Sequence, residues 1–139
     1  MSLTITITIP QSPEQVYDAV IDVGSWWTGD ISGPTAELGQ EFTYRYQDKH
    51  RSTHRVDELV PAHRVVWLTT DANLPFADDP TEWIGTRQIF DISPAAHGTD
   101  LKFTHEGLEP QLDCYDSCSN AWSYFIRTSL PARIAAAPA

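Results

Sequence analysis

Hydrophobic positions along the chain follow two periods, and each period predicts a different kind of element. At the N-terminus every second residue is apolar, with threonines between: Leu3, Ile5, Ile7 and Ile9. This alternation is typical of a strand with one buried face. Pro10 ends the predicted strand, because proline has no N–H to donate to a neighbouring strand.

The next segment carries the start signals of a helix. Ser12 is a preferred N-cap residue, Pro13 suits the first helical position, and Gln15 stands where it completes a capping box. Apolar residues then recur with helical spacing until Gly24. The tryptophan pair that ends at Trp27 predicts a second short helix or a tight turn.

From residue 39 onward the period returns to two. It predicts five strands, over residues 41–46, 51–60, 64–70, 83–92 and 99–106. The third of these is apolar on both faces, so we expect it at the centre of the sheet. Several of the alternating positions are aromatic or polar. On the inner faces we place Phe42, Tyr44, Tyr46, His54, Ile84, Gln88, Phe90, Phe103 and His105.

The last predicted element is a long helix over about residues 111–130. One stripe of it carries Cys114, Cys118, Trp122, Phe125 and Ser129. Pro131 is expected to end this helix, and the Ala/Pro-rich segment 131–139 to fray. The order of elements predicts an α+β two-layer domain, in which the helix lies across a curved antiparallel sheet and two short helices follow the first strand.

Length and charge narrow the class of protein. With 139 residues the chain is expected to form a single domain, with an ordered core over about residues 3–130. The formal net charge of −10 repels phosphate backbones and anionic headgroups, which argues against nucleic-acid and membrane partners. The N-terminus lacks the basic start of a signal peptide, so we expect a cytoplasmic protein. The sequence does not specify an oligomeric state.

Three motifs resemble a known family. They are Ile-Pro-x-Ser-Pro-Glu-x-Val-Tyr-x-Ala at 9–19, Val-x-Glu-x-x-Pro-x-x-Arg-Val at 56–65, and Gly-Thr-x-Leu-x-Phe-Thr-His-Glu-Gly-Leu at 98–108, followed by Trp122. The chain is similar over about residues 3–130 to the heat-shock-protein ATPase activator homologues, a family of the START-like superfamily. The resemblance implies a helix-grip fold. It also implies one of three roles, since the superfamily holds ligand-binding domains, polyketide cyclases and chaperone regulators.

The residues favour a cavity for a small, largely hydrophobic molecule between the sheet and the C-terminal helix. A mostly apolar pocket with a few converging polar groups is typical of small-molecule sites. As ligand-binding candidates we take Trp27, Tyr44, Tyr46, His54, Trp67, Gln88, Phe90, Phe103, His105, Cys118, Trp122 and Phe125. The segment 71–82, which contains Leu74 and Phe76, is interpreted as a mobile gate over one mouth of this cavity.

Two other interpretations involve chemistry at His105. A histidine on a cavity wall can shuttle protons, which would make the protein an enzyme of the cyclase, aromatase or dehydratase kind. It can also be a buried histidine with a structural hydrogen bond, and we favour that interpretation. A third alternative is a protein-interaction module of the chaperone-regulator type, which requires an exposed apolar patch and a filled interior.

Neither a metal nor a cofactor is expected. Cys114, Cys118 and His105 offer three zinc ligands, but structural zinc sites generally use four ligands and closer cysteine pairs. Cysteines four residues apart on a helix lie too far from each other for a disulfide, which predicts two free thiols. The motifs that bind nucleotides or activate serine nucleophiles do not occur in the sequence.

Overall fold

The computed structural model describes residues 2–27, 29–75, 80–109 and 115–136. Seven strands form one sheet: β1 (Ser2–Ile9), β2 (Asp30–Ser32), β3 (Glu41–Tyr46), β4 (His50–Val60), β5 (Arg64–Asn73), β6 (Arg87–Ala95) and β7 (Gly98–Glu106). The helical elements are α1 (Pro13–Ile21), the 3₁₀ turn η1 (Val23–Ser25), α2 (Tyr115–Tyr124), the π-helical segment η2 (Phe125–Ser129) and α3 (Leu130–Ala136).

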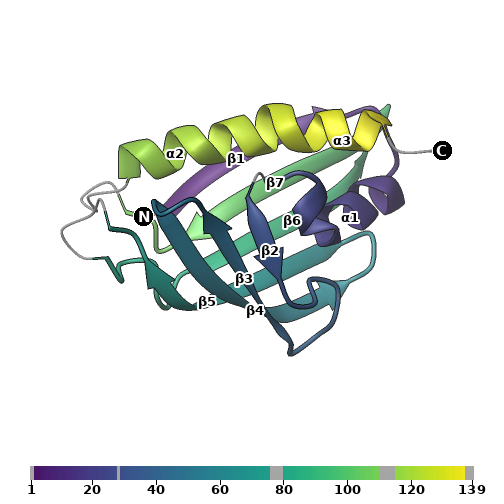
Figure 1. The fold of residues 1–139 in the computed structure, drawn as a ribbon. Coiled ribbons are helices and arrows are strands. Elements are labelled where there is room, and N and C mark those ends of the chain that lie inside the picture. The colour runs from purple at the N-terminus through teal and green to yellow at the C-terminus, as the bar shows by residue number, and fades with distance from the viewer. Residues whose placement is uncertain (1, 28, 76–79, 110–114, 137–139) are drawn as a thin grey trace.

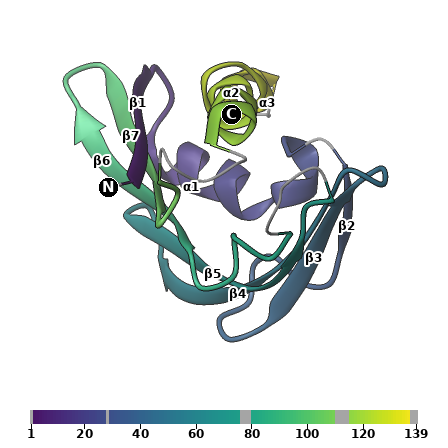
Figure 2. The ribbon, with the colours of Figure 1, turned by 90° about the vertical axis from the view of Figure 1, so that its left-hand side faces the viewer.

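The sheet is antiparallel throughout, in the order β1-β7-β6-β5-β4-β3-β2. Figure 1 shows α2 and α3 running end to end across it, and Figure 2 shows the sheet curving beneath them, with α1 inside the curve. The predicted α+β architecture is therefore confirmed, including the two short helices after the first strand. Among the described residues, no helix has the length and apolar character that crossing a membrane requires.

Local sequence signals account for several of these elements. The Ser12 hydroxyl accepts a hydrogen bond from the Gln15 backbone N–H at 3.2 Å, and the Gln15 side chain accepts one from the Ser12 N–H at 3.0 Å. This is the predicted capping box, and it starts α1 at Pro13. Strand β5 occupies the middle of the sheet and buries both of its faces, at Val66 and Trp67 for example. Its central position is also confirmed.

The start of one predicted strand is wrong, and one short strand is not predicted. The strand expected over 83–92 begins only at Arg87, since Gly85 adopts a φ of +87° and residues 83–85 form a turn. Ile84 is consequently 45% exposed and does not join the inner face. The short strand β2 was not predicted, because three residues are too few to establish a period.

The expected loop over 71–82 also needs correction. Strand β5 extends to Asn73, and Leu74 is fully buried, with its N–H donating to the Pro80 carbonyl at 2.9 Å. Leu74 is therefore part of the core and not of a mobile gate. Phe76 lies outside the described residues.

The C-terminal helix does not end at Leu130. It passes through Pro131 to Ala136, so the expectation of a frayed tail is wrong for residues 131–136. A proline inside a regular α-helix collides with the carbonyl four residues earlier. Here the wider turn η2 comes directly before it, and the Leu130 N–H donates to the Phe125 carbonyl five residues back. The extra residue in this turn makes room for the proline ring.

The π-helical turn also changes which side chains face the sheet. Before, within and after this turn, the buried side chains are spaced four residues apart, at Cys118, Trp122, Ile126, Leu130 and Ile134. Phe125, which was predicted to pack in this stripe, is half-buried instead, and Ile126 takes its place. The predicted start near residue 111, with Cys114, lies outside the described residues.

Truncating the adjacent side chains of Phe125 and Ile126 tests which of them is buried against the sheet. Ile126→Ala should lower the free energy of unfolding by about 2–5 kcal/mol, as expected for a fully buried aliphatic residue. Phe125→Ala should cost about half as much or less, because its ring is partly exposed. Urea denaturation of both variants measures the difference. A larger loss for Phe125→Ala would contradict the π-helical phase.

Candidate functional site

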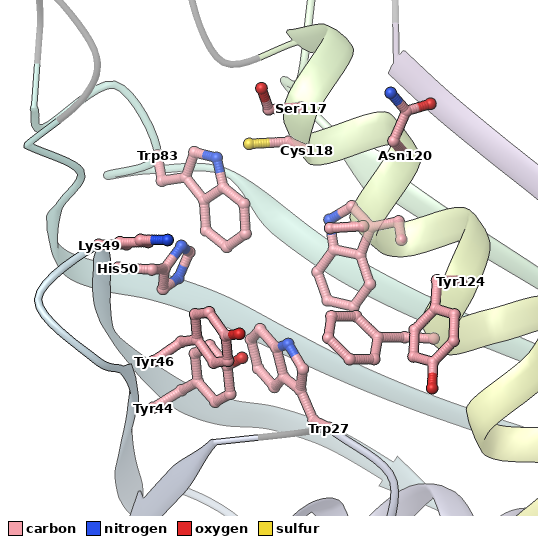
Figure 3. Close-up of a pocket in the computed structure, with 13 residues that line it drawn as sticks. Trp27, Tyr44, Tyr46, Lys49, His50, Trp83, Ser117, Cys118, Asn120 and Tyr124 are labelled. Carbon is pink, nitrogen blue, oxygen red and sulfur yellow. The ribbon is translucent and has the colours of Figure 1, made fainter.

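A cavity of about 570 Å³ lies between the concave face of the sheet and the segment α2–η2 (Figure 3). Its walls come from the segment after η1, from β3, β4 and the turn between them, from the turn before β6, and from the helix. The lining residues are Trp27, Tyr44, Tyr46, Lys49, His50, Trp83, Ser117, Cys118, Asn120, Ala121, Trp122, Tyr124 and Phe125.

Aromatic rings make the walls of this cavity rigid. Trp27 stacks on Tyr44 with ring centroids 3.9 Å apart and an angle of 9° between the planes. Trp83 lies parallel to Trp122 at 6.1 Å, and the edge of His50 meets Trp83 at 4.7 Å. Rings that hold each other in place lose little conformational freedom when a ligand binds, so the cavity is preorganised.

Twelve residues were predicted to bind the ligand, and the structure divides them into two groups. Six line the cavity, namely Trp27, Tyr44, Tyr46, Cys118, Trp122 and Phe125. The other six are fully buried behind its wall: His54, Trp67, Gln88, Phe90, Phe103 and His105. The sequence alternation correctly gave the inner face of each strand, but it could not separate the cavity surface from the core beneath it.

Several lining residues were missed. His50 stands four positions before His54, and the same alternation would have placed both on one face. Trp83 was assigned to a strand, whereas it lies in the turn before β6 with only 3% of its surface exposed. Lys49, Ala121 and the polar residues at the start of α2 gave no signal in the sequence, since their positions depend on how the helix docks.

A network of buried polar side chains lies directly behind the aromatic wall. The Trp122 indole N–H donates to His105 Nδ1 at 3.0 Å, and His105 Nε2 lies 2.8 Å from the Thr86 hydroxyl. That hydroxyl donates to the Trp83 carbonyl at 2.6 Å. Both ring nitrogens of His105 are thus engaged, which favours the structural interpretation of this histidine over a role as a general base.

The network continues across the sheet to the cavity. His54 Nδ1 lies 2.9 Å from Gln88 Oε1, and Gln88 Nε2 lies 3.0 Å from His105 Nε2. On its other side, His54 Nε2 is 2.8 Å from Ser52 Oγ, which is 2.9 Å from His50 Nε2. A continuous chain of hydrogen-bonding groups therefore joins His50, on the cavity wall, to the helix residue Trp122.

Burial keeps these histidines neutral. Burial, with a smaller effect of the neighbouring histidines, lowers the pKa of His54 and of His105 to about 3 each. Burial also lowers the pKa of His50 to about 4. The pKa of the Tyr44 hydroxyl is raised by burial, so this group stays protonated. The only charge on the described lining at neutral pH is therefore that of Lys49.

The described residues offer no metal site, because no three His, Cys, Asp or Glu side chains converge among them. Cys118 is a free, buried thiol. The predicted partner thiol at Cys114 lies outside the described residues, so the expectation of two free thiols stays a prediction.

The fold and the cavity define a helix-grip domain of the START-like superfamily. The family model described as Activator of Hsp90 ATPase homolog 1-like protein matches residues 10–135, and the chain belongs to this family. The resemblance noted in the sequence is thereby confirmed. No curated protein matches the chain.

Solved structures with the same fold include an Aha1 protein. The solution structure of the Aha1 dimer from Colwellia psychrerythraea is 26% identical, covers 92% of each chain, and has a TM-score of 0.76. Protein MLL2253 from Mesorhizobium loti covers 100% of both chains at 17% identity, with a TM-score of 0.80. DynU16, a putative protein in the dynemicin biosynthetic locus, covers 97% of this chain and 47% of that chain, at 16% identity and a TM-score of 0.71. The last two similarities establish the fold alone.

The neutral histidines predict a dependence of stability on pH. In the unfolded chain a histidine takes up a proton near pH 6.5, whereas folded His54 and His105 do so only near pH 3. The unfolded state therefore binds more protons between these values. The free energy of unfolding should fall as the pH drops from 6.5 to 5.5, by up to about 1.4 kcal/mol per pH unit for each buried histidine.

Urea denaturation across this pH interval measures the slope. His54→Gln should reduce this slope by the contribution of one buried histidine. His63→Gln removes an exposed histidine outside the network and is the matched control. A slope that is the same in wild type and in His54→Gln would contradict the neutral state of His54.

Proposed function

We propose that the protein binds a small, largely hydrophobic molecule in the cavity between the sheet and α2–η2. The observation that carries this proposal is the cavity itself, at about 570 Å³ and walled mainly by aromatic rings. Small-molecule sites generally enclose roughly 300–1,000 Å³ and combine apolar walls with a few polar groups. The strongly acidic charge supports a small molecule as the partner rather than nucleic acid or a membrane surface.

The geometry gives less support to the other two roles. An enzyme of the cyclase kind that used His105 as a base would need a free ring nitrogen facing the ligand. His105 is fully buried and does not line the cavity in the part of the chain that the structure describes. A module that only binds another protein would not need an open interior. The cytoplasmic location and the single-domain organisation remain part of the proposal.

Filling the cavity tests the proposal. Ala121 lines it from α2 and is exposed to it, so Ala121→Trp adds a large ring inside the cavity without replacing a core residue. The neutral fluorescent probe N-phenyl-1-naphthylamine should bind the wild type, and its affinity for Ala121→Trp should fall about tenfold or more, since the added indole takes the probe's place. Fluorescence titration measures both affinities.

The control introduces the same side chain elsewhere on the C-terminal helix. Ala132 is exposed on α3 and lies outside the cavity lining, so Ala132→Trp should bind the probe as the wild type does. Equal probe affinity in wild type and Ala121→Trp, with both proteins folded, would refute binding in this cavity.

A further inference from the structure

The cavity differs in charge from the rest of the protein. The chain contains 19 acidic and 9 basic residues, yet none of the described lining residues is acidic, and Lys49 supplies a positive charge. Within the described ranges, Lys49 takes part in none of the ion pairs. Figure 3 shows Lys49 and His50 together on the sheet side of the cavity, facing the helix across it. This end of the cavity therefore suits a negatively charged group.

The hydrogen bonds behind the wall determine what His50 offers to a ligand. The order of donors and acceptors is fixed at Trp122, because an indole N–H can only donate. His105 Nδ1 accepts this bond, so the neutral ring carries its proton on Nε2. This N–H points at the Thr86 hydroxyl, whose own hydrogen is donated to the Trp83 carbonyl.

The orientation of the Gln88 amide determines which nitrogen of His54 carries the proton. With its Nε2 placed 3.0 Å from His105 Nε2, the amide would set one N–H against another. The two ends of an amide have nearly the same shape, and the hydrogen-bond network decides between them. Turning the amide by 180° gives His105 an acceptor and directs an N–H at His54 Nδ1, 2.9 Å away. The single His105 Nε2–H is then shared between the Thr86 and Gln88 oxygens, and His54 Nδ1 receives an amide N–H. The Thr69 hydroxyl lies within 3.2 Å of both amide atoms and can donate to the oxygen in either orientation, so the histidines decide between the two and favour the turned amide.

The tautomer of His54 in turn determines the tautomer of His50 at the cavity wall. Because His54 Nδ1 accepts, His54 Nε2 carries the proton and donates to Ser52 Oγ at 2.8 Å. The Ser52 hydroxyl in turn donates to His50 Nε2 at 2.9 Å. The proton of neutral His50 must therefore sit on Nδ1. This N–H has no hydrogen-bond partner among the described residues, and the ring lines the cavity.

We propose that the ligand is an apolar carboxylate, whose carboxylate group accepts hydrogen bonds from His50 Nδ1–H and from the Lys49 ammonium group. Its apolar body packs against the tryptophans of the wall. A carboxylate has acceptors only, so it matches two donors that meet at one end of an apolar cavity. This inference rests on the proposed function and names the chemical class of the ligand.

Two probes of nearly the same shape separate charge from shape. 2-Naphthoate carries a carboxylate, and 2-naphthamide has the same rings with a neutral polar group. By isothermal titration calorimetry at pH 7, the wild type should bind the carboxylate about tenfold more tightly, as hydrogen bonds to a charged acceptor are the stronger ones.

Variants of Lys49 and His50 show how much each donor contributes to naphthoate binding. Lys49→Met should lower the preference for naphthoate over naphthamide about three- to tenfold, since an exposed charge contributes modestly. Lys102→Met is the matched control, because it removes the other lysine of the chain from an exposed position on β7. His50→Phe keeps the aromatic ring but loses the donor, and should weaken naphthoate binding about tenfold or more.

A measurement on the wild type tests the assigned protons without any substitution. Long-range ¹H–¹⁵N correlation spectra distinguish the two neutral forms of each histidine. His50 should carry its proton on Nδ1, and His54 and His105 on Nε2. A proton on Nε2 of His50 would overturn the proposal.

The outcomes also separate this proposal from the proposed function. If N-phenyl-1-naphthylamine binds but naphthoate and naphthamide bind equally well, the carboxylate proposal fails and the apolar binding function stands. If Lys102→Met weakens naphthoate binding as much as Lys49→Met does, the carboxylate proposal also fails. If none of the three probes binds, both proposals fail.

Discussion

The interior depends on one hydrogen bond, from the Trp122 indole to His105, which joins the C-terminal helix to the sheet. Burying polar groups away from water costs free energy unless each one finds a partner. On the concave face of the sheet, one connected set of buried side chains meets this requirement, namely Ser52, His54, Thr69, Thr86, Gln88 and His105, whereas the buried Trp67 indole N–H has no hydrogen-bond partner among the described residues. Sliding the helix along the sheet would break the set at Trp122, so the helix has one favoured position.

The cavity exists because the helix docks differently along its length. From Ile126 onward its inner side chains are almost completely buried against the sheet and α1, as Leu130 and Ile134 show. At α2 the side chains of Ala121 and Tyr124 face open space instead. The π-helical turn lies at the change between the two halves, where it accommodates Pro131 and moves Phe125 out of the core and onto the cavity wall.

Local patterns in the sequence were sufficient for the fold and for about half of the site. Alternation placed Phe103 and His105 on the inner face, and cap residues located α1. The misplaced Phe125 has a clear physical cause, since a helical spacing of 3.6 residues does not anticipate a π-helical turn. Trp83 and Ala121 belong to the cavity only through the docking of distant elements, which no local pattern encodes.

Isotope-filtered nuclear Overhauser spectroscopy measures directly where the bound molecule lies. With ¹³C-labelled protein and unlabelled N-phenyl-1-naphthylamine, contacts from the probe should appear at the Ala121 methyl group and at the rings of Trp83 and Trp122. Contacts confined to exposed apolar residues such as Leu38 or Ile84 would contradict an apolar binding site between sheet and helix.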